Sequence, residues 1–343
     1  MLWVRHHIYA DTAVSTATFR EQITFIICAK NEGKNLEKYL PLWLAQEDID
    51  FTLLIVDDGS TDNTASLIAD IIHPRLQYHH ISPDEKVGRG KKYALQKGIA
   101  LADTPWVLLT DADCMPCNNF WAANMMQYAA DSDVVLGISP YMHKDTGLLS
   151  ALIDYETFLT AAQYTAWANA RMAYMGVGRN MAYKKSLTQY IDSDSYYGTA
   201  SGDDDIFIQN IWKKARIATA IDIGSHTYSY APETFWSWVR QKSRHYSTGF
   251  HYDLVHQMGL GSFIFSKVMM HVSGVYALFH NYTLGLLVYV AYLCISIGLF
   301  FSINKKMKMP LNIWWIFFTD IIMSLMYVLV GFYSKSNSNR RWK

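Results

Sequence analysis

The chain has 343 residues, enough for one large domain or two ordinary ones. Its formal net charge is zero, so no overall field favours nucleic acid, and we expect no nucleic-acid partner. Charged residues make up 17% of the chain and are sparse in residues 262–333. Four cysteines are too few for a disulfide scaffold, and Cys114 and Cys117 form a single CxxC, which is weak support for a metal or redox site.

Strands and helices are expected to alternate after a loose, flexible leader over residues 1–21, which has no continuous apolar stretch. Apolar runs predict strands within segments 23–29, 51–58, 75–81, 105–114 and 132–140. Helical spacing of apolar residues predicts helices within segments 34–46, 61–72 and 90–102. This order predicts an α/β fold, with a mainly parallel sheet covered by helices on both faces.

Acidic residues follow three of these predicted strands. Glu32 follows the first, Asp57 and Asp58 follow the second, and Asp111 and Asp113 follow the strand that begins near residue 105. Ligands of such sheets bind outside the carboxyl ends of the strands. The sequence therefore predicts a ligand site built around these carboxylates.

The last third of the chain contains three apolar segments, at residues 263–280, 283–303 and 311–333. The second is uncharged and long enough to span a bilayer. The third carries Asp320 near its middle, and because a buried acid is costly in lipid, we expect a broken or re-entrant helix there.

Basic residues on both sides of the third segment bear on its orientation. Lys305, Lys306 and Lys308 precede it, and a basic tail containing Arg340 and Arg341 follows it. Both groups are expected to face the cytoplasm. This is satisfied if the first two segments cross the membrane and the third returns to its own side, which predicts a multi-pass protein of the cell inner membrane.

Seven short motifs occur along the chain in this order: AKNEGKN, VDDGSTD, GRGKKYAL, TDADC, GRNMAY, GDDD and QKSRH. The series resembles the family 2 inverting glycosyltransferases of GT-A fold, over about residues 22–250. The resemblance implies a GT-A domain over residues 22–232 and an interfacial region over 233–261, where the sequence is aromatic and basic. Membrane helices over 262–334 and a basic cytoplasmic tail over 335–343 would follow.

The resemblance implies a nucleotide-sugar donor, with a UDP-sugar expected first, and a Mg²⁺ or Mn²⁺ cofactor. Asp113 is then the expected metal ligand, and Asp111 contacts the metal or the ribose. Alternate residues of an extended chain point the same way, which would place both carboxylates on one side. Ala29, Glu32 and Asp58 would line the nucleotide pocket, and Lys91 or Arg89 would reach the phosphates. Asp57 is expected to bond the backbone amides of the GST turn.

The resemblance also assigns the acceptor side of the site. Asp204 is the expected general base, Asp203 precedes it, and Asp205 is the second choice because three adjacent acids leave the register open. Crowded carboxylates raise one pKa, which suits a base. The remaining residues implied to contact the acceptor or the diphosphate are Arg179, Asn180, Gln241 and Arg244. QKSRH departs from the family's QxxRW at His245, which leaves processive synthesis in doubt.

Several functions remain open from the sequence. The acceptor is expected to be a lipid-linked saccharide or a polysaccharide at the membrane lipid surface, where residues 235–238 offer aromatic side chains. A processive polysaccharide synthase, a polyprenyl-phosphate sugar transferase and an inactive GT-A membrane scaffold are the alternatives. A dinucleotide-binding dehydrogenase and a P-loop ATPase are disfavoured, because CAKNEGKN lacks GxGxxG and EKVGRGKK lacks the P-loop pattern.

Overall fold

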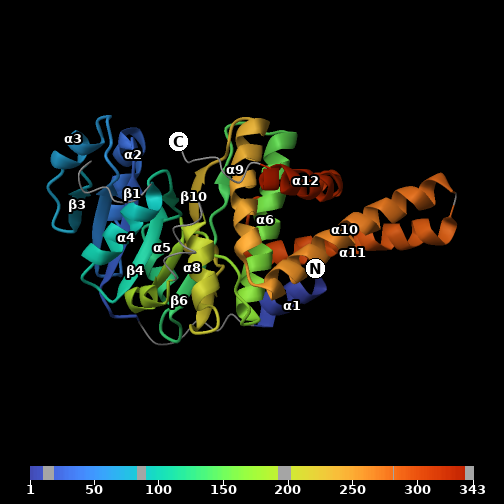
Figure 1. Cartoon of the computed structure of the whole chain (residues 1–343), viewed down its shortest axis with the longest axis horizontal. Helices are drawn as coiled ribbons and strands as arrows, with labels where there is room; N and C mark the ends of the chain where they lie inside the picture. Colours follow the sequence, from blue (N-terminus) through green and yellow to red (C-terminus); the bar gives the residue numbers. More distant parts are fainter. Residues whose placement is uncertain (11–18, 83–89, 192–201, 281, 337–343) are drawn as a thin grey trace.

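The computed structural model describes residues 1–10, 19–82, 90–191, 202–280 and 282–336. Three parts of the sequence predictions lie outside these ranges: Arg89, residues 11–18 of the leader and residues 340–343 of the basic tail. Figure 1 shows three parts in order along the molecule: a sheet with its helices, a pair of upright helices, and a long helical hairpin.

Within the described residues, seven strands form the main sheet in the order β3-β2-β1-β4-β8-β6-β9. These strands are β1 (Ile23–Ala29), β2 (Phe51–Asp57), β3 (Leu76–His80), β4 (Trp106–Asp111), β6 (Val134–Gly137), β8 (Met181–Lys184) and β9 (Ile217–Ala220). All neighbouring pairs are parallel except those that involve β8, which runs antiparallel to both β4 and β6. The expected mainly parallel sheet is confirmed.

Helices connect the strands, and the first three lie at the segments expected to be helical, whereas the helix at residues 121–126 was not expected. They are α2 (Gly33–Leu44), α3 (Thr64–Ala69), α4 (Lys91–Leu101), α5 (Trp121–Met126) and α8 (Asp203–Ile211). The central strands are apolar and buried on both faces, as in sheets that are covered on each side. Two separate hydrophobic clusters, one against each face, therefore fix the sheet between the helices.

A small second sheet closes one edge of the domain. It contains β5 (Met115–Pro116), β10 (Thr227–Tyr230) and β7 (Tyr141–Met142), with β10 in the middle. The segments that follow β4 and β6 are thereby joined through β10. This places Tyr141 beside the carboxyl edge of the main sheet.

Two long helices stand between the sheet and the hairpin. The first, α6 (Leu148–Asn169), is buried along most of its length, and the second, α9 (Phe235–Thr248), begins with a capping box at Thr234 and Ser237. Figure 1 shows both helices upright between the sheet and the C-terminal helices. They form the wall on which the C-terminal helices pack.

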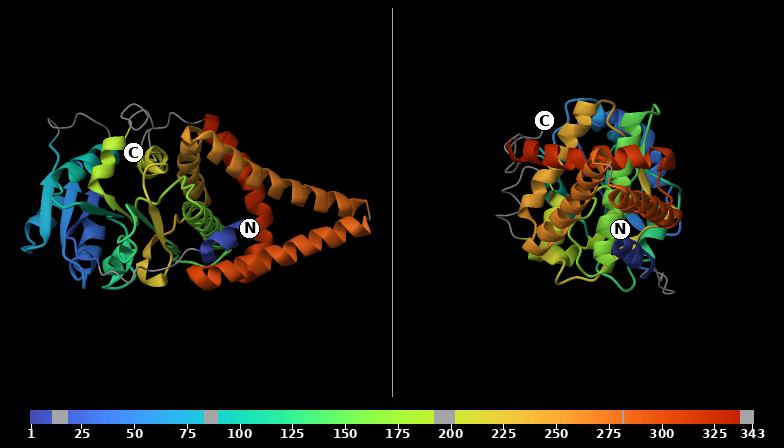
Figure 2. Two further views of the ribbon diagram at one scale, coloured as in Figure 1. Left: turned by 90° about the horizontal axis from the view of Figure 1, so that it is seen from below. Right: turned by 90° about the vertical axis from the view of Figure 1, so that its right-hand side faces the viewer.

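The hairpin consists of α10 (Leu254–Phe279) and α11 (Thr283–Met307), which project away from the body, meet at the tip and diverge toward the body (Figure 2). Both are long and apolar enough to cross a membrane. The last helix, α12 (Ile316–Ser336), runs across the hairpin direction (Figure 2) and packs on α9 and α6. The third apolar segment is thus not arranged as a parallel third helix of the hairpin.

The start of the chain differs from expectation. Residues 2–10 form a helix, α1 (Leu2–Ala10), instead of a loose leader. Val4 and Ile8 are buried against α6 and the end of α11, and the Tyr9 hydroxyl donates to the Ser302 carbonyl at 2.7 Å. The helix escaped sequence reasoning because its apolar residues pack on partners about 150 and 300 positions later in the chain.

Candidate active site

The ends of three central strands lie side by side at the carboxyl edge of the sheet. The register pairs Ala29 of β1 with Asp57 of β2, and Cys28 of β1 with Asp111 of β4. The Asp58 amide donates to the Ala29 carbonyl at 2.8 Å, which continues the pairing one step beyond the strands. The parallel register therefore brings the acids of two separate motifs to one edge.

Asp57 shapes the turn that follows β2. One of its carboxylate oxygens accepts from the Ser60 amide at 2.8 Å and the Ser60 hydroxyl at 2.6 Å, and the other accepts from the Tyr78 hydroxyl at 2.7 Å. Burial alone would raise the pKa of Asp57, but these hydrogen bonds hold it below the ordinary value. The expected role of Asp57 in the GST turn is confirmed, while Asp58, which is 2% exposed, remains a predicted nucleotide contact.

The two aspartates of TDADC lie in a different local structure from the one expected. Strand β4 ends at Asp111, and the chain turns at Ala112 and Asp113, with the Cys114 amide donating to the Asp111 carbonyl at 3.0 Å. The extended-chain argument for their common direction is therefore wrong. The two carboxylates are nevertheless close enough for Asp111 to influence the titration of Asp113.

The strand-end acids form a crowded group. The Asp113 side chain is solvent-accessible yet surrounded by protein atoms, and this desolvation, followed by the charge of Asp111, raises its pKa. Burial likewise raises the pKa of Glu32, with smaller contributions from Asp113 and Asp111, although Asn35 donates to the Glu32 carboxylate at 2.6 Å. A cation placed among these carboxylates would relieve their mutual repulsion.

Lys91 is the cation nearest to Asp111. Its ammonium lies 2.5 Å from the Asp111 carboxylate. Burial would lower the pKa of Lys91, but the negative charges of Asp111 and Asp203 outweigh burial and hold that pKa above its ordinary value. The ammonium therefore stays charged, at the point where the strand-end acids meet the acids of α8.

The three acids at the start of α8 point to different places. The Asp205 carboxylate is buried and accepts from the Tyr252 hydroxyl at 2.6 Å, so it belongs to the packing between α8 and η4 (Gly249–His251) with the residues after it. The Asp204 carboxylate accepts from the Gly178 amide at 2.7 Å and from the Asp205 amide at 3.0 Å. Gly202 precedes them with a φ of 79°, and a Cβ there would lie 2.4 Å from the Thr248 side chain.

One pocket joins the two groups of acids. Lys91, Asp111, Gly178, Asp203 and Asp204 all line it. Burial, followed by the charge of Asp203, raises the pKa of Asp204 to about 6. A carboxylate with this pKa is ionised at neutral pH and basic enough to accept a proton from a hydroxyl.

Arg179 is a second positively charged residue close to the acids. Its guanidinium donates to the Tyr141 hydroxyl and the Ser139 carbonyl, each at 2.8 Å, and its carbon lies 4.4 Å from the centre of the Tyr141 ring. Burial would lower the pKa of Arg179, but Tyr141, Cys114 and Asp113 hold it above the ordinary value. Arg179 is therefore a fixed positive charge near Asp113.

Tyr141 links Arg179 to helix α9 and was missed by sequence reasoning. The Gln241 side-chain amide donates to the same hydroxyl at 3.1 Å. Arg244 follows one turn later and is exposed. A tyrosine four positions after the end of β6 has no distinguishing sequence pattern, and the pairing of β7 with β10 reveals its place.

Asn180 does not occupy a ligand-facing position. It is fully buried, donates to the Ile138 carbonyl at 2.7 Å and the Ser225 carbonyl at 2.8 Å, and accepts from the Trp121 indole at 3.1 Å. Its amide also fills the space where a Cβ on Gly137 would stand. The expected contact with acceptor or diphosphate is therefore replaced by a structural role that fixes the loop carrying Arg179.

The donor set suits a hard divalent cation. No group of three or more His, Cys, Asp or Glu residues is arranged as a metal site in the part of the chain that the structure describes. Asp111 and Asp113 provide two carboxylates, and Mg²⁺ and Mn²⁺ both accept oxygen ligands from carboxylates and phosphates. The residues therefore fit a cation that is shared with a bound diphosphate.

Comparison with known proteins identifies the class. The model of "Glycosyl transferase family 2" matches residues 24–199, just over half of the chain. The chain therefore belongs to glycosyl transferase family 2 and is a glycosyltransferase with the GT-A fold. The match includes the strand-end acids and Arg179, while α8 and α9 lie beyond its end.

Two kinds of relative accompany this match. Poly-beta-1,6-N-acetyl-D-glucosamine synthases of Staphylococcus epidermidis and Staphylococcus aureus are 34% and 38% identical over 93 residues. These residues are 27% of this chain and 22% of each synthase. The mannosyltransferase PcManGT of Pyrobaculum calidifontis, solved with GDP-Man and Mn²⁺, has a TM-score of 0.58 at 17% identity and covers 89% of this chain and 92% of its own. At this identity the likeness shows the fold.

Asn180 provides a test of this account of the site. Asn180→Ala removes two donors to buried carbonyls and the acceptor of the Trp121 indole, so we expect the protein to lose about 2–4 kcal/mol of stability. Thermal or denaturant unfolding in detergent measures the loss. Asn119→Ala is the matched control, because Asn119 is exposed and makes one 3.4 Å contact with Glu47. Equal stability of the two variants would contradict the structural role.

Proposed function

We propose that this chain is a membrane-attached glycosyltransferase that moves a sugar, with inversion, from a nucleotide-sugar donor to a hydroxyl of a lipid-linked saccharide or polysaccharide. A UDP-sugar is the donor expected first. The observation that carries the proposal is the shared pocket, in which Asp204, with a pKa of about 6, faces the same space as Asp111 and Lys91. Sugar transfer by a single displacement needs a base close to the diphosphate, and this pocket places Asp204 beside Asp111 and Lys91.

On the donor side, the nucleotide lies over the strand ends. Ala29, Glu32 and Asp58 line the pocket for the base and the ribose, and Asp111 contacts the ribose or the metal. Lys91 and Arg179 bring fixed positive charge to the diphosphate, which leaves with additional negative charge. Mg²⁺ or Mn²⁺, held by Asp113 and Asp111, would offset more of that charge.

On the acceptor side, Asp204 accepts the proton of the incoming hydroxyl as its oxygen attacks the sugar carbon. The bond between that carbon and the diphosphate oxygen breaks at the opposite face, so the configuration inverts. Hydrogen bonds from the Gly178 and Asp205 amides hold the Asp204 carboxylate in place. Asp203, Gln241 and Arg244 lie around the diphosphate and the acceptor in this proposal.

The proposed attachment to the membrane rests on the hairpin of α10 and α11. We infer that α10 and α11 cross the cell inner membrane, that α12 packs on this hairpin, and that the catalytic domain lies on the cytoplasmic side. Phe235 and Trp236 at the start of α9 are 39% and 66% exposed and would contact membrane lipids or a lipid-linked acceptor. Trp238 is 1% exposed, so the expected aromatic surface is smaller than the sequence indicated.

Two alternatives share the same site. A processive polysaccharide synthase is favoured by the similarity to poly-beta-1,6-N-acetyl-D-glucosamine synthases, although the match covers only 22% of their length. A polyprenyl-phosphate sugar transferase would use the same base toward a phosphate oxygen. Product size and acceptor dependence in the assay below distinguish them from addition of one sugar.

The first test is turnover of the Asp204→Asn variant. Wild-type protein should release nucleotide from one member of a panel of UDP- and GDP-sugars, and only with Mn²⁺ or Mg²⁺. Loss of the base should lower this rate by about 10²–10⁴-fold, with nucleotide affinity within a few-fold of wild type.

Asp205→Asn is the matched control for that test. The Asp205 carboxylate is buried and accepts a hydrogen bond from the Tyr252 hydroxyl at 2.6 Å, and the side-chain oxygen of an asparagine can accept the same bond. We expect this variant to retain most of the activity. A normal rate in Asp204→Asn, or an inactive but folded Asp205→Asn, would overturn the choice of base. An inactive membrane scaffold would show no nucleotide release in the wild type.

The pH profile gives a second test. Because the base must be ionised, kcat/KM should rise with pH through an apparent pKa near 6 and level off above it. Below that value the rate should fall by up to tenfold per pH unit. Titration of nucleotide binding over the same range controls for protonation of Asp113 and Glu32. A rate that stays level down to pH 4.5, with binding intact, would rule out Asp204 as the base.

A further inference from the structure

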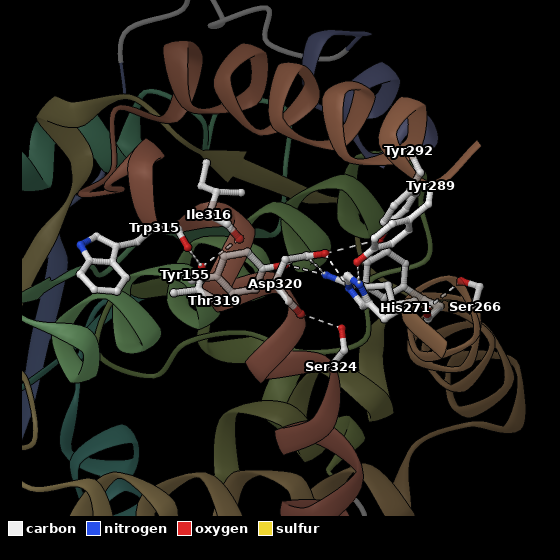
Figure 3. A network of polar contacts seen from close by, with 12 residues as sticks. Tyr155, Ser266, His271, Tyr289, Tyr292, Trp315, Ile316, Thr319, Asp320 and Ser324 are labelled. Carbon is white, nitrogen blue, oxygen red and sulfur yellow. Dashed lines mark hydrogen bonds and ion pairs between the residues drawn. The ribbon is translucent and has the colours of Figure 1, made fainter. Parts of the chain in front are cut away.

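The helix that crosses the hairpin carries a buried carboxylate with no role in the proposed reaction. Asp320 of α12 is 3% exposed and lies between α6, α10 and α11 (Figure 3). A carboxylate in such apolar surroundings is costly unless it is paired and hydrogen-bonded. Its partners therefore show what it does.

Both oxygens of Asp320 are occupied by side chains from three other helices. One oxygen is bonded by the Lys267 ammonium of α10 and the Tyr155 hydroxyl of α6. The other lies 3.0 Å from the His271 ring of α10 and 3.5 Å from the Tyr292 hydroxyl of α11.

Two outer contacts complete the group. The Lys267 ammonium also reaches the Tyr155 hydroxyl at 2.6 Å, and the other ring nitrogen of His271 lies 2.9 Å from the Tyr289 hydroxyl of α11. Figure 3 shows His271, Tyr289 and Tyr292 gathered on one side of Asp320 and Tyr155 on the other.

This cluster is closed to ligands. Lys267, His271 and Asp320 are 6%, 7% and 3% exposed, and the lysine charge is matched by the carboxylate. An anion would have to displace Asp320 from its donors, and a cation would have to displace Lys267. The arrangement fits a structural contact that fixes the helices relative to one another, and not a binding site. We call this contact between Asp320, Lys267, His271 and the three tyrosines the joint.

The joint has a specific geometric consequence. If the hairpin slid or rotated against α6 and α12, Lys267 and Asp320 would be separated in an apolar environment, which is strongly unfavourable. The stacking of Tyr155 on Phe300 of α11, with ring centres 5.2 Å apart, adds a contact between the same elements. A shift of the hairpin would therefore break several of these contacts at once.

The joint also connects to the helix that carries the acceptor-side residues. Glu156, next to Tyr155 on α6, forms a buried ion pair with Lys242 of α9, and Lys242 follows Gln241. Helix α12 packs directly on α9 as well. The hairpin, α6 and α9 are thus held at one set of mutual positions.

We propose that Asp320 is a positioning residue that fixes the hairpin relative to α6 and α9, and so sets the distance and angle at which a membrane-bound acceptor meets the pocket. The proposal rests on the membrane attachment proposed above. It assigns no chemical step to Asp320, which touches neither donor nor reacting atoms.

The direct test measures hairpin position. Spin labels at Ile72→Cys, which is 100% exposed, and Leu278→Cys, which is 60% exposed near the hairpin tip, report one distance by pulsed electron paramagnetic resonance. Cys294, the exposed one of the four cysteines, is replaced by serine. We expect a narrow distribution in the parent protein and in Leu325→Ala, an exposed site on the same helix, and a broad one in Asp320→Asn.

A second variant separates positioning from folding. Asp320→Asn leaves Lys267 buried without its counter-ion, whereas Lys267→Met combined with Asp320→Asn removes both charges, so the double variant should recover thermal stability. Its distance distribution should stay broad, because Tyr155, His271 and Tyr292 still lack the carboxylate. A narrow distribution in either variant would overturn the proposal.

Kinetics give a readout that general destabilisation would not produce. With a polyprenyl-diphosphate-linked monosaccharide in nanodiscs as the acceptor probe, Asp320→Asn should raise KM for this probe about tenfold while kcat and nucleotide affinity change little. Parallel loss of nucleotide affinity would contradict a positioning role. If wild-type protein transfers nothing to the probe, the proposed function fails on that point, and the distance measurement still decides the role of Asp320.

Discussion

The site depends on the concentration of negative charge at the carboxyl edge of one parallel sheet. Asp111 and Asp113 arrive there because β4 lies beside β1, and α8 delivers Asp203 and Asp204 to the same pocket. Carboxylates held this close destabilise one another unless cations or protons intervene. The fold supplies positive charge in Lys91 and Arg179, and a divalent ion bound together with a diphosphate would offset more of the negative charge of the carboxylates.

The same crowding explains how three adjacent aspartates acquire different properties. Asp205 turns into the protein and bonds Tyr252, while Asp203 contributes to the charge around Lys91. Asp204 lies between them, with two backbone amides on its carboxylate and a raised pKa. A single helix N-terminus thus provides a structural acid, a charge partner and a candidate base at successive positions.

Much of this could be read from the sequence, and the failures have physical causes. Apolar runs that end in acids predicted the strands and the sheet edge, and the ordered motifs carried the resemblance to the family, because both are local patterns in the sequence. Asn180 was misassigned because its partners, Trp121, Ile138 and Ser225, are brought together only by tertiary packing. Tyr141 and helix α1 were missed for the same reason, since long-range contacts leave no local periodicity.

The membrane segments show a mixed outcome. Asp320 led us to expect a broken or re-entrant helix, but α12 is continuous over Ile316–Ser336, and nothing in the sequence revealed that Lys267 and His271 are the partners of Asp320. The charged residues lower the hydropathy of two separate apolar segments, but they become partners of one another when the helices pack together (Figure 3).

The most direct measurement of the central claim is calorimetric titration of the full-length protein with UDP and with GDP, each with Mn²⁺ and with a chelator. If the crowded carboxylates hold a divalent ion, one of the two nucleoside diphosphates should bind only when that ion is present. Asp113→Asn should then lose this metal-dependent binding. Equal affinity with and without the ion in wild-type protein, or none for either nucleotide, would contradict it.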